Sequence, residues 1–316
     1  MARVTNLLNR VQRVSGRILN DSRWRNFYLQ RYVSVPALRR FVSGRIAKDL
    51  PQPASGARDP AAAARVDEIK RNGVTVYRDG AAPQAVTELR EWLQTQLCVD
   101  PDRPGDPGFL WNDGAGKGCV HAYYPIETLM RAPHLLELAN TPQVLGIVQR
   151  VFGCTPTISE INCWWLNHDL DVDLAKVRHG YYVERQKSYH RDIDDWSVLR
   201  YFVYLTDVDQ AHGPHSYIPG THNRYMRQHR NMDFDENPNG LYETRIDITG
   251  PAGTAILMDP FGLHRATVPT AGDRLMLAVT YSLGCATVHA PKNPLLVSAG
   301  LGIDPFVNRL YVGAPS

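Results

Sequence analysis

Long apolar runs, closely paired cysteines and a strong excess of one charge are all missing from this chain of 316 residues. No apolar run reaches the roughly 18 residues that a membrane-spanning helix needs, and the first residues lack the apolar core of a secretory signal. Five cysteines are scattered along the chain, namely Cys98, Cys119, Cys154, Cys163 and Cys285. An odd, dispersed set argues against a disulfide framework or a zinc site and indicates reduced thiols in a cytoplasmic protein.

Charge is nearly balanced over the whole chain but is divided unevenly along it. The net charge is +3, yet residues 1–50 hold 11 basic and two acidic side chains, so this segment alone carries +9. The remaining residues hold 24 basic and 30 acidic side chains and carry −6. The body is therefore mildly acidic, which argues against nucleic-acid binding, and its 43% of hydrophobic residues is enough for a sizeable core.

The basic segment at residues 1–50 has the periodicity of an amphipathic helix. Leu7, Val11, Val14 and Ile18 recur at intervals of three and four, and the arginines lie largely off that stripe. A helix of this kind packs on protein, lies on an anionic membrane surface, or forms part of an organelle transit peptide. Packing on the body or on a second subunit is the commonest of these outcomes, and peripheral contact with a membrane is the main alternative.

The chain divides into a basic helical arm at 1–50, a proline-rich linker at 51–60 and one domain at 61–316. Helices are expected near 61–71, 83–98, 126–140 and 142–152. Strands are expected near 74–77, 158–166, 187–191, 197–206, 215–218, 243–248, 254–258, 263–268 and 274–283. The eight short strands after residue 157 predict a mainly β fold with flanking helices (α+β), of the sandwich or jelly-roll type. The polar stretch 222–242 is expected to be an inserted loop near the mouth of the barrel.

A candidate metal site begins with His190 and Asp192, which stand two residues apart beside strand-like sequence. Residues i and i+2 of a strand point to the same face, so both side chains are expected to project into one space. An imidazole and a carboxylate make up two thirds of a two-histidine, one-carboxylate iron site. The triplet alone is weak evidence, because short motifs recur by chance and a lone histidine is usually a hydrogen-bonded surface residue.

Later motifs provide the context that the triplet lacks. In chain order they are an apolar strand at 198–208, the turn residues Gly213-Pro214 and Pro219-Gly220-Thr221-His222, a glycine-led strand at 253–259, His264 and Arg274. This order resembles the phytanoyl-CoA dioxygenase-like branch of the iron(II)/2-oxoglutarate dioxygenases. The resemblance covers about residues 61–284 and leaves out the basic arm.

The resemblance implies a double-stranded β-helix, a jelly-roll and cupin-like fold, with Fe(II) held at its mouth by His190, Asp192 and His264. It also implies that Arg274 binds the distal carboxylate of 2-oxoglutarate. The chemistry of the donor set agrees, because two imidazoles and one carboxylate bind iron on one face and leave positions for the 2-oxo acid and O2. A planar guanidinium is the side chain best suited to a carboxylate.

Three further positions are assigned to the cosubstrate pocket by the resemblance. Relatives often place Ser or Thr two residues after the distal histidine, where this chain has Ala266, and a shortened turn would bring Thr267 into that role. Gln186 and Trp196 match positions that line the pocket in some relatives. Ordinary core packing is an equally good interpretation of Trp196.

The predicted function is hydroxylation of an unactivated C–H bond in a small-molecule, lipid or glycolipid-type substrate, with release of succinate and CO2. Related halogenases replace the acidic ligand with a small residue, so the presence of Asp192 favours hydroxylation. One alternative is a cupin-type metal dioxygenase that does not use 2-oxoglutarate, against which Arg274 argues. The other is a catalytically inactive jelly-roll binding protein, against which the intact ligand set argues.

Overall fold

The computed structural model describes most of the chain. The described residues are 21–22, 24–25, 29–30, 35–53, 60–101, 103, 105, 107–113, 119–168, 189–225, 231–232, 238–284 and 302–312. The stripe from Leu7 to Ile18, Gln186, Cys285 and part of the 222–242 insertion lie outside these residues. The division into arm, linker and domain stays a prediction.

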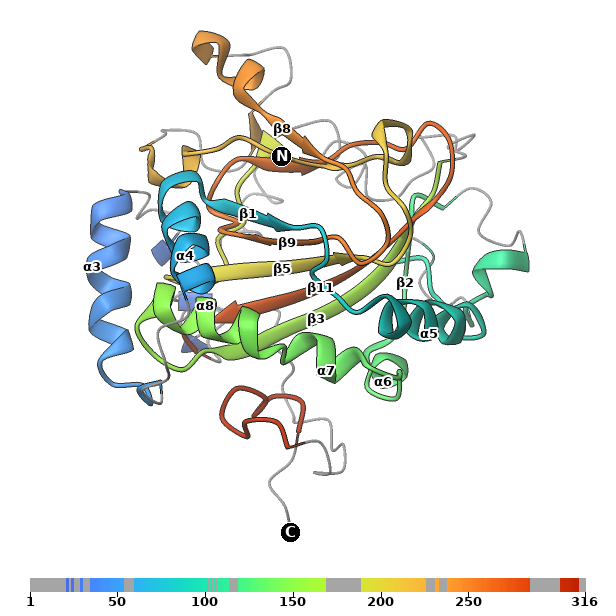
Figure 1. Ribbon diagram of the computed structural model, residues 1–316, viewed down its shortest axis with the longest axis horizontal. Helices are drawn as coiled ribbons and strands as arrows, with labels where there is room; N and C mark the ends of the chain where they lie inside the picture. The colour runs from blue at the N-terminus through green and yellow to red at the C-terminus, as the bar shows by residue number, and fades with distance from the viewer. Residues whose placement is uncertain are drawn as a thin grey trace, which may run out of the picture.

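Two antiparallel β-sheets form the centre of the molecule (Figure 1). The larger sheet consists, in spatial order, of β1 (Val74–Tyr77), β9 (Ala255–Met258), β5 (Val198–Tyr204), β11 (Arg274–Ser282), β3 (Thr157–Leu166) and β2 (His121–Tyr123). The smaller sheet consists of β7 (Asn231–Met232), β4 (Tyr189–His190), β10 (His264–Ala266), β6 (His215–Tyr217) and β8 (Ile246–Ile248). From β3 onward the chain alternates between the sheets, apart from the segment β6–β7–β8. This is the double-stranded β-helix that the sequence predicts.

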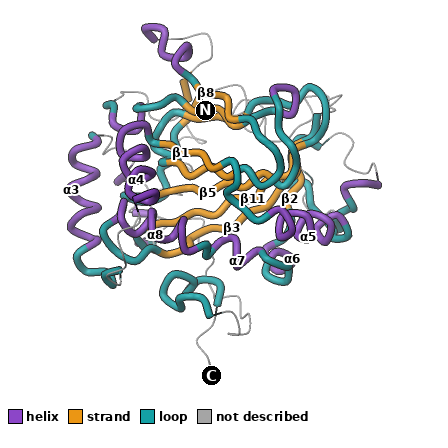
Figure 2. The backbone as a smooth tube through the Cα atoms, in the orientation of Figure 1, coloured by secondary structure: helices purple, strands orange, loops and turns teal. Residues whose placement is uncertain are grey.

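Helices cover the outer face of the larger sheet, as the purple segments beside the orange strands show (Figure 2). They are α3 (Pro36–Ala47), α4 (Pro60–Asn72), α5 (Pro83–Gln94), α6 (Ile126–Leu129), α7 (Leu135–Ala139) and α8 (Pro142–Phe152). Short 3₁₀ turns occur at Trp111–Asp113, Gln210–His212, Thr221–Asn223 and Pro238–Thr244. No helix in the described part of the chain is long and apolar enough to cross a membrane.

Local sequence predicts most element boundaries, with two corrections. The helix expected at 126–140 is two short helices, because Pro133 interrupts the pattern and His134 adopts a φ of 59°, outside the helical region. Strand β2 was not predicted. Its three residues are too few to show a periodicity, and they pair with the end of β3 and, through Tyr123, with Val99.

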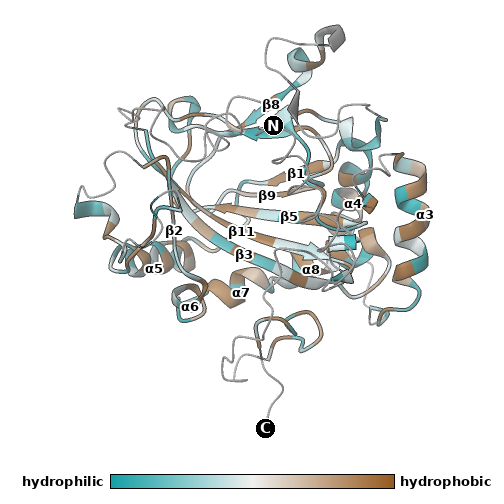
Figure 3. Cartoon of the chain, turned by 180° about the vertical axis from the view of Figure 1, so that it is seen from behind, coloured by the Kyte–Doolittle hydropathy of each residue, from teal (hydrophilic) through white to brown (hydrophobic). Residues whose placement is uncertain are grey.

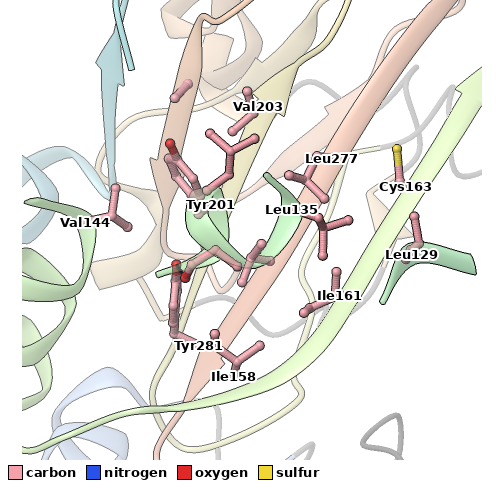
Figure 4. Packing of buried hydrophobic residues seen from close by; sticks show 14 of the residues in the cluster. Leu129, Leu135, Val144, Ile158, Ile161, Cys163, Tyr201, Val203, Leu277 and Tyr281 are labelled. Atoms are coloured by element: carbon pink, nitrogen blue, oxygen red, sulfur yellow. Dashed lines mark hydrogen bonds between the residues drawn. The ribbon is translucent and has the colours of Figure 1, made fainter. Parts of the chain in front are cut away.

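Strand β11 separates the two parts of the hydrophobic core. Its alternate residues from Leu275 to Tyr281 pack toward the helices, together with residues such as Leu135 of α7 (Figure 4). The intervening residues from Arg274 to Thr280 face the space between the sheets, because successive side chains of a strand point to opposite faces. Figure 3 shows hydrophobic residues along β9 and on α5 and α7. The helix-covered face is thus apolar, and polar groups are concentrated between the sheets.

Candidate metal centre and cosubstrate site

The two histidines of the predicted triad are cross-strand neighbours in the smaller sheet. His190 of β4 pairs directly with His264 of β10, and their ring centroids lie 4.5 Å apart. Asp192 follows β4, and its backbone N–H donates to the carbonyl of Pro260 at 2.9 Å in the loop before β10. The fold therefore brings together residues more than 70 positions apart through one strand pairing and one backbone hydrogen bond.

The side chains of the triad form a compact, buried set of donors. One ligand atom from each of His190, Asp192 and His264 lies within 4.8 Å of the others. The His264 Nε2 atom is 3.4 Å from Asp192 Oδ2, and the His190 Nε2 atom is 3.9 Å from Asp192 Oδ1. The Nδ1 atom of His264 lies 3.0 Å from the carbonyl of Gly262, which can only accept. The Nδ1–H group of His264 therefore donates to Gly262, and Nε2 is the ring atom that faces Asp192.

Arg200 of β5 contacts the carboxylate of the triad and was missed by the sequence analysis. Its guanidinium lies 2.6 Å from Asp192 Oδ2, 2.9 Å from Asp194 and 3.6 Å from Glu160. Burial alone would raise the pKa of Asp192, but Arg200 and the two imidazoles outweigh it and hold that pKa well below its ordinary value. Asp192 is therefore ionised and ready to bind a cation. A single charged residue inside the apolar run 198–205 was the available signal.

Arg274 opens β11 and is fully buried at the other end of the barrel interior. Its Nη1 donates to the carbonyl of Gly213, while Nε and Nη2 have no hydrogen-bond partner. Burial lowers the pKa of Arg274, opposed only by nearby Tyr204. No ion pair involves this guanidinium within the part of the chain that the structure describes. Buried polar groups are almost always hydrogen-bonded, so two orphaned donors on a buried cation indicate a missing anionic ligand.

His215 and Phe202 lie between these two ends and were also missed as site residues. The ring of His215 is 5.6 Å from that of His264 and 5.0 Å from that of Phe202. Burial, followed by the charges of His264 and Arg274, lowers the pKa of His215 well below its usual value. The interior between the triad and Arg274 is therefore lined by a neutral imidazole and an aromatic ring.

The residues fit the metal and cosubstrate that the sequence analysis expected. Two imidazoles and one ionised carboxylate, gathered on one side of a buried space, are the donor set of non-haem iron sites with open positions. The unpaired donors of Arg274 provide a partner for a carboxylate within the same interior. Both requirements are met by buried side chains that border one interior.

Comparison with known proteins identifies the family. The family model described as phytanoyl-CoA dioxygenase matches residues 69–275, which is more than half of the chain. The chain belongs to the phytanoyl-CoA dioxygenase family. Membership confirms the predicted enzyme class, an iron(II)- and 2-oxoglutarate-dependent oxygenase. No curated protein matches the chain significantly in sequence.

Solved structures support the fold of this phytanoyl-CoA dioxygenase family member. The epimerase SnoN from nogalamycin biosynthesis, solved with Fe3+, alpha ketoglutarate and nogalamycin RO, has a TM-score of 0.52 and 16% identity, covering 82% of this chain and 97% of SnoN. EctD from S. alaskensis in its apoform has a TM-score of 0.51 and 18% identity, covering 83% of this chain and 91% of EctD. At these identities the likeness concerns the fold alone.

Two of the other predicted cosubstrate residues, Thr267 and Trp196, lie among the described residues, and each has contacts of its own. The hydroxyl of Thr267 donates to the carbonyl of Pro214 at 2.7 Å, and Ala266 is the residue that shares a face of β10 with His264. Trp196 packs in the larger core and is 5.7 Å from the guanidinium of Arg39. Gln186 lies outside the described residues. Cosubstrate binding by these three residues stays a prediction.

Proposed function

We propose that this protein hydroxylates an unactivated C–H bond of a small molecule, with conversion of 2-oxoglutarate and O2 to succinate and CO2. One observation carries the proposal. A buried two-histidine, one-carboxylate set and a buried arginine with two unpaired donors border the same interior. A structural salt bridge or a lost active site would not explain why the buried guanidinium of Arg274 keeps two donors without a hydrogen-bond partner.

Four residues of the chain would bind the metal ion and the cosubstrate. His190, Asp192 and His264 would hold Fe(II), and Arg274 would bind the distal carboxylate of 2-oxoglutarate with Nε and Nη2. Bound iron and cosubstrate would supply the oxidising chemistry that removes hydrogen from an unactivated carbon. The burial of all four residues would exclude bulk water from that chemistry.

Hydroxylation is favoured over halogenation by the ligand set. Asp192 occupies the position where a small residue would leave room for chloride, and its carboxylate is held ionised by Arg200. The structural neighbour SnoN is an epimerase, so members of this fold can also return a rearranged product. Product analysis by mass separates these outcomes, because hydroxylation adds one oxygen and epimerisation adds none.

A small substrate with an apolar ring face suits the inner surface of the larger sheet. Tyr123 and Trp164 stack with centroids 5.7 Å apart at an interplanar angle of 25°, and Phe202 meets Trp164 edge-on at 6.4 Å. Tyr123 and Trp164 are only half-buried. Aromatic walls with few polar groups are typical of small-molecule pockets. A lipid-linked substrate would fit this wall as well, and remains part of the proposal.

The test is cosubstrate binding and turnover with the purified protein. We expect 2-oxoglutarate to raise the melting temperature when Fe(II) is present under anaerobic conditions, and we expect slow succinate release once O2 is admitted. The variants His264→Ala and Arg274→Met should abolish succinate release. A wild-type protein that shows neither a melting shift nor succinate would instead support the binding-protein alternative.

A further inference from the structure

One arginine of helix α3, Arg39, contacts the loops next to the candidate metal ligands. Arg39 is only 6% exposed, although its neighbours on the helix, Arg40 and Arg45, are exposed. The guanidinium donates to the backbone carbonyl of Asp195 at 2.7 Å and lies within 3.4 Å of that of Trp196. Arg39 thus binds the backbone of the loop that begins at Asp192.

The guanidinium groups of Arg39 and Arg191 both pack on the ring of Phe261, and these three side chains form a stack. Arg39 lies 4.4 Å from the centre of the Phe261 ring, and Arg191 lies 4.5 Å from it. Arg191 is the residue between His190 and Asp192, and Phe261 stands three residues before His264. The two segments that supply all three candidate ligands therefore meet at this stack.

Arg191 extends the contact to a third segment. Its Nη2 donates to the carbonyls of Thr221 at 2.6 Å and Arg224 at 3.1 Å, at the start of the inserted loop. The backbone hydrogen bond from Asp192 to Pro260 joins the two ligand segments directly. Helix α3, both ligand segments and the turn before the insertion are tied together within a few ångströms.

Two buried guanidinium groups at this stack are not required to hold helix α3 against the domain. Burial lowers the pKa of Arg39, and nearby Asp259, Asp195 and Asp194 oppose that shift. Arg191 is buried as well, with 1% of its surface exposed. An apolar side chain would dock α3 without burying a second cation beside the first, since buried charges are costly unless closely compensated. Arg39 therefore points to a role in fixing the loop carbonyls and the Phe261 ring.

A cavity beside the stack makes the packing around Arg39 sensitive to a shorter side chain. It has a volume of about 560 Å³ and lies between α3 and the ligand loops, with Arg39, Asp195, Phe261 and Asp192 among its lining residues. Shortening Arg39 would enlarge the cavity toward Asp192. Loop residues with less packing around them become free to move.

We propose that Arg39 is a positioning residue for the metal centre, acting through the Asp195 carbonyl and the Phe261 ring. Helix α3 lies outside the family-matched residues 69–275, so the basic N-terminal segment would contribute a working part to the active site. This inference rests on the proposed function, because it assumes that His190, Asp192 and His264 bind the metal.

The test measures Co(II) affinity and the visible absorption of bound Co(II), whose bands report ligand geometry, in the full-length protein. Arg39→Met should weaken Co(II) binding by about tenfold, as loss of outer contacts to metal ligands commonly does. It should also shift the absorption bands. Arg39→Lys should recover part of the affinity, and Arg45→Met on the exposed side of α3 is the matched control that should change nothing.

A double-mutant cycle with Phe261→Leu tests the route of the effect. If Arg39 acts through the ring, Arg39→Met and Phe261→Leu should weaken Co(II) binding non-additively. An Arg39→Met protein with a lower melting temperature but unchanged affinity and spectrum would overturn the inference and leave Arg39 as a docking residue. Failure of the proposed function looks different, because Co(II) affinity of the wild type would then be unaffected by His264→Ala.

Discussion

Two arginines stand at opposite ends of the barrel interior, and their surroundings differ sharply. Arg200 has carboxylate oxygens of Asp192, Asp194 and Glu160 within 3.6 Å, and its side chain is 19% exposed. Arg274 is fully buried, with one backbone carbonyl as its partner and two unpaired nitrogens. The comparison teaches that a paired buried cation organises the protein, whereas an unpaired one awaits a ligand.

The largest effect is expected when Arg274 is replaced. Arg274→Met should weaken 2-oxoglutarate binding by at least about 30-fold, because loss of a buried charge partner costs roughly 2–5 kcal/mol. The variant without cosubstrate should melt no lower than the wild type, since an unpaired buried charge has been removed. Calorimetric titration and melting curves check both points. A large loss of stability in the free protein would show that Arg274 already has its partner.

Replacement of Arg200 should lower stability and leave cosubstrate binding in place, which is the opposite of the effects expected for Arg274. Arg200→Met removes the cation that Asp192, Asp194 and Glu160 share, so the free energy of unfolding should fall by about 3 kcal/mol. Urea unfolding measures this loss, and 2-oxoglutarate should still raise the melting temperature. The control is Arg245→Met, whose exposed pair with Asp247 contributes roughly 0–1 kcal/mol. Equal losses of unfolding free energy in Arg200→Met and Arg245→Met would contradict the view that the Arg200 ion pairs stabilise the protein.

A smaller effect is expected on the pH dependence of stability, through His121 near Arg274. Burial, and then the charge of Arg274, lowers the pKa of His121 to about 3 from an unfolded value of about 6.5. The unfolded chain therefore binds more protons between these two values, and stability is lost as the pH falls from about 6.5 toward 3. The loss should approach about 1.4 kcal/mol per pH unit. Unfolding curves of His121→Asn should have a pH slope shallower by that amount, and a matching slope would mean that His121 titrates normally.

The smallest effect is expected for the basic arm on membranes. The described part of the arm, α3, packs against α8 and buries Arg39 in the body, which favours packing on protein over a lipid surface. We expect the full-length protein to sediment equally with neutral and anionic vesicles. Replacement of Arg3, Arg10, Arg13 and Arg17 by glutamine should change nothing. Preferential sedimentation with anionic vesicles that these replacements abolish would restore the membrane interpretation.

The sequence predicted the triad because its information is local. His190 ends β4 and Asp192 follows two residues later, and the order of the later turns and strands indicates where His264 and Arg274 lie in a double-stranded β-helix. Arg200, His215 and Arg39 could not be predicted in the same way. Each owes its place to strand register or helix docking, which joins residues far apart in the chain.

Trp196 and Thr267 show what the structure adds to positions assigned by resemblance, while cosubstrate binding by these residues stays a prediction. Trp196 lies four residues from Asp192, yet it packs in the helix-covered core. The hydroxyl of Thr267 is engaged by Pro214, while Ala266 shares the face of His264. A single step along a strand reverses the direction of a side chain, so sequence distance from a ligand does not decide which space a residue faces.

The sequence by itself determined the enzyme class and the jelly-roll fold and predicted the candidate donors, because these depend on residue type and on the order and spacing of motifs. Only the tertiary structure decided which charges are paired. Arg200 and Arg274 are the same residue type on adjacent strands. The register of β5 and β11 places three carboxylates near Arg200 and leaves Arg274 without an ion pair among the described residues. That difference is why we propose structural support for the first guanidinium and cosubstrate binding for the second.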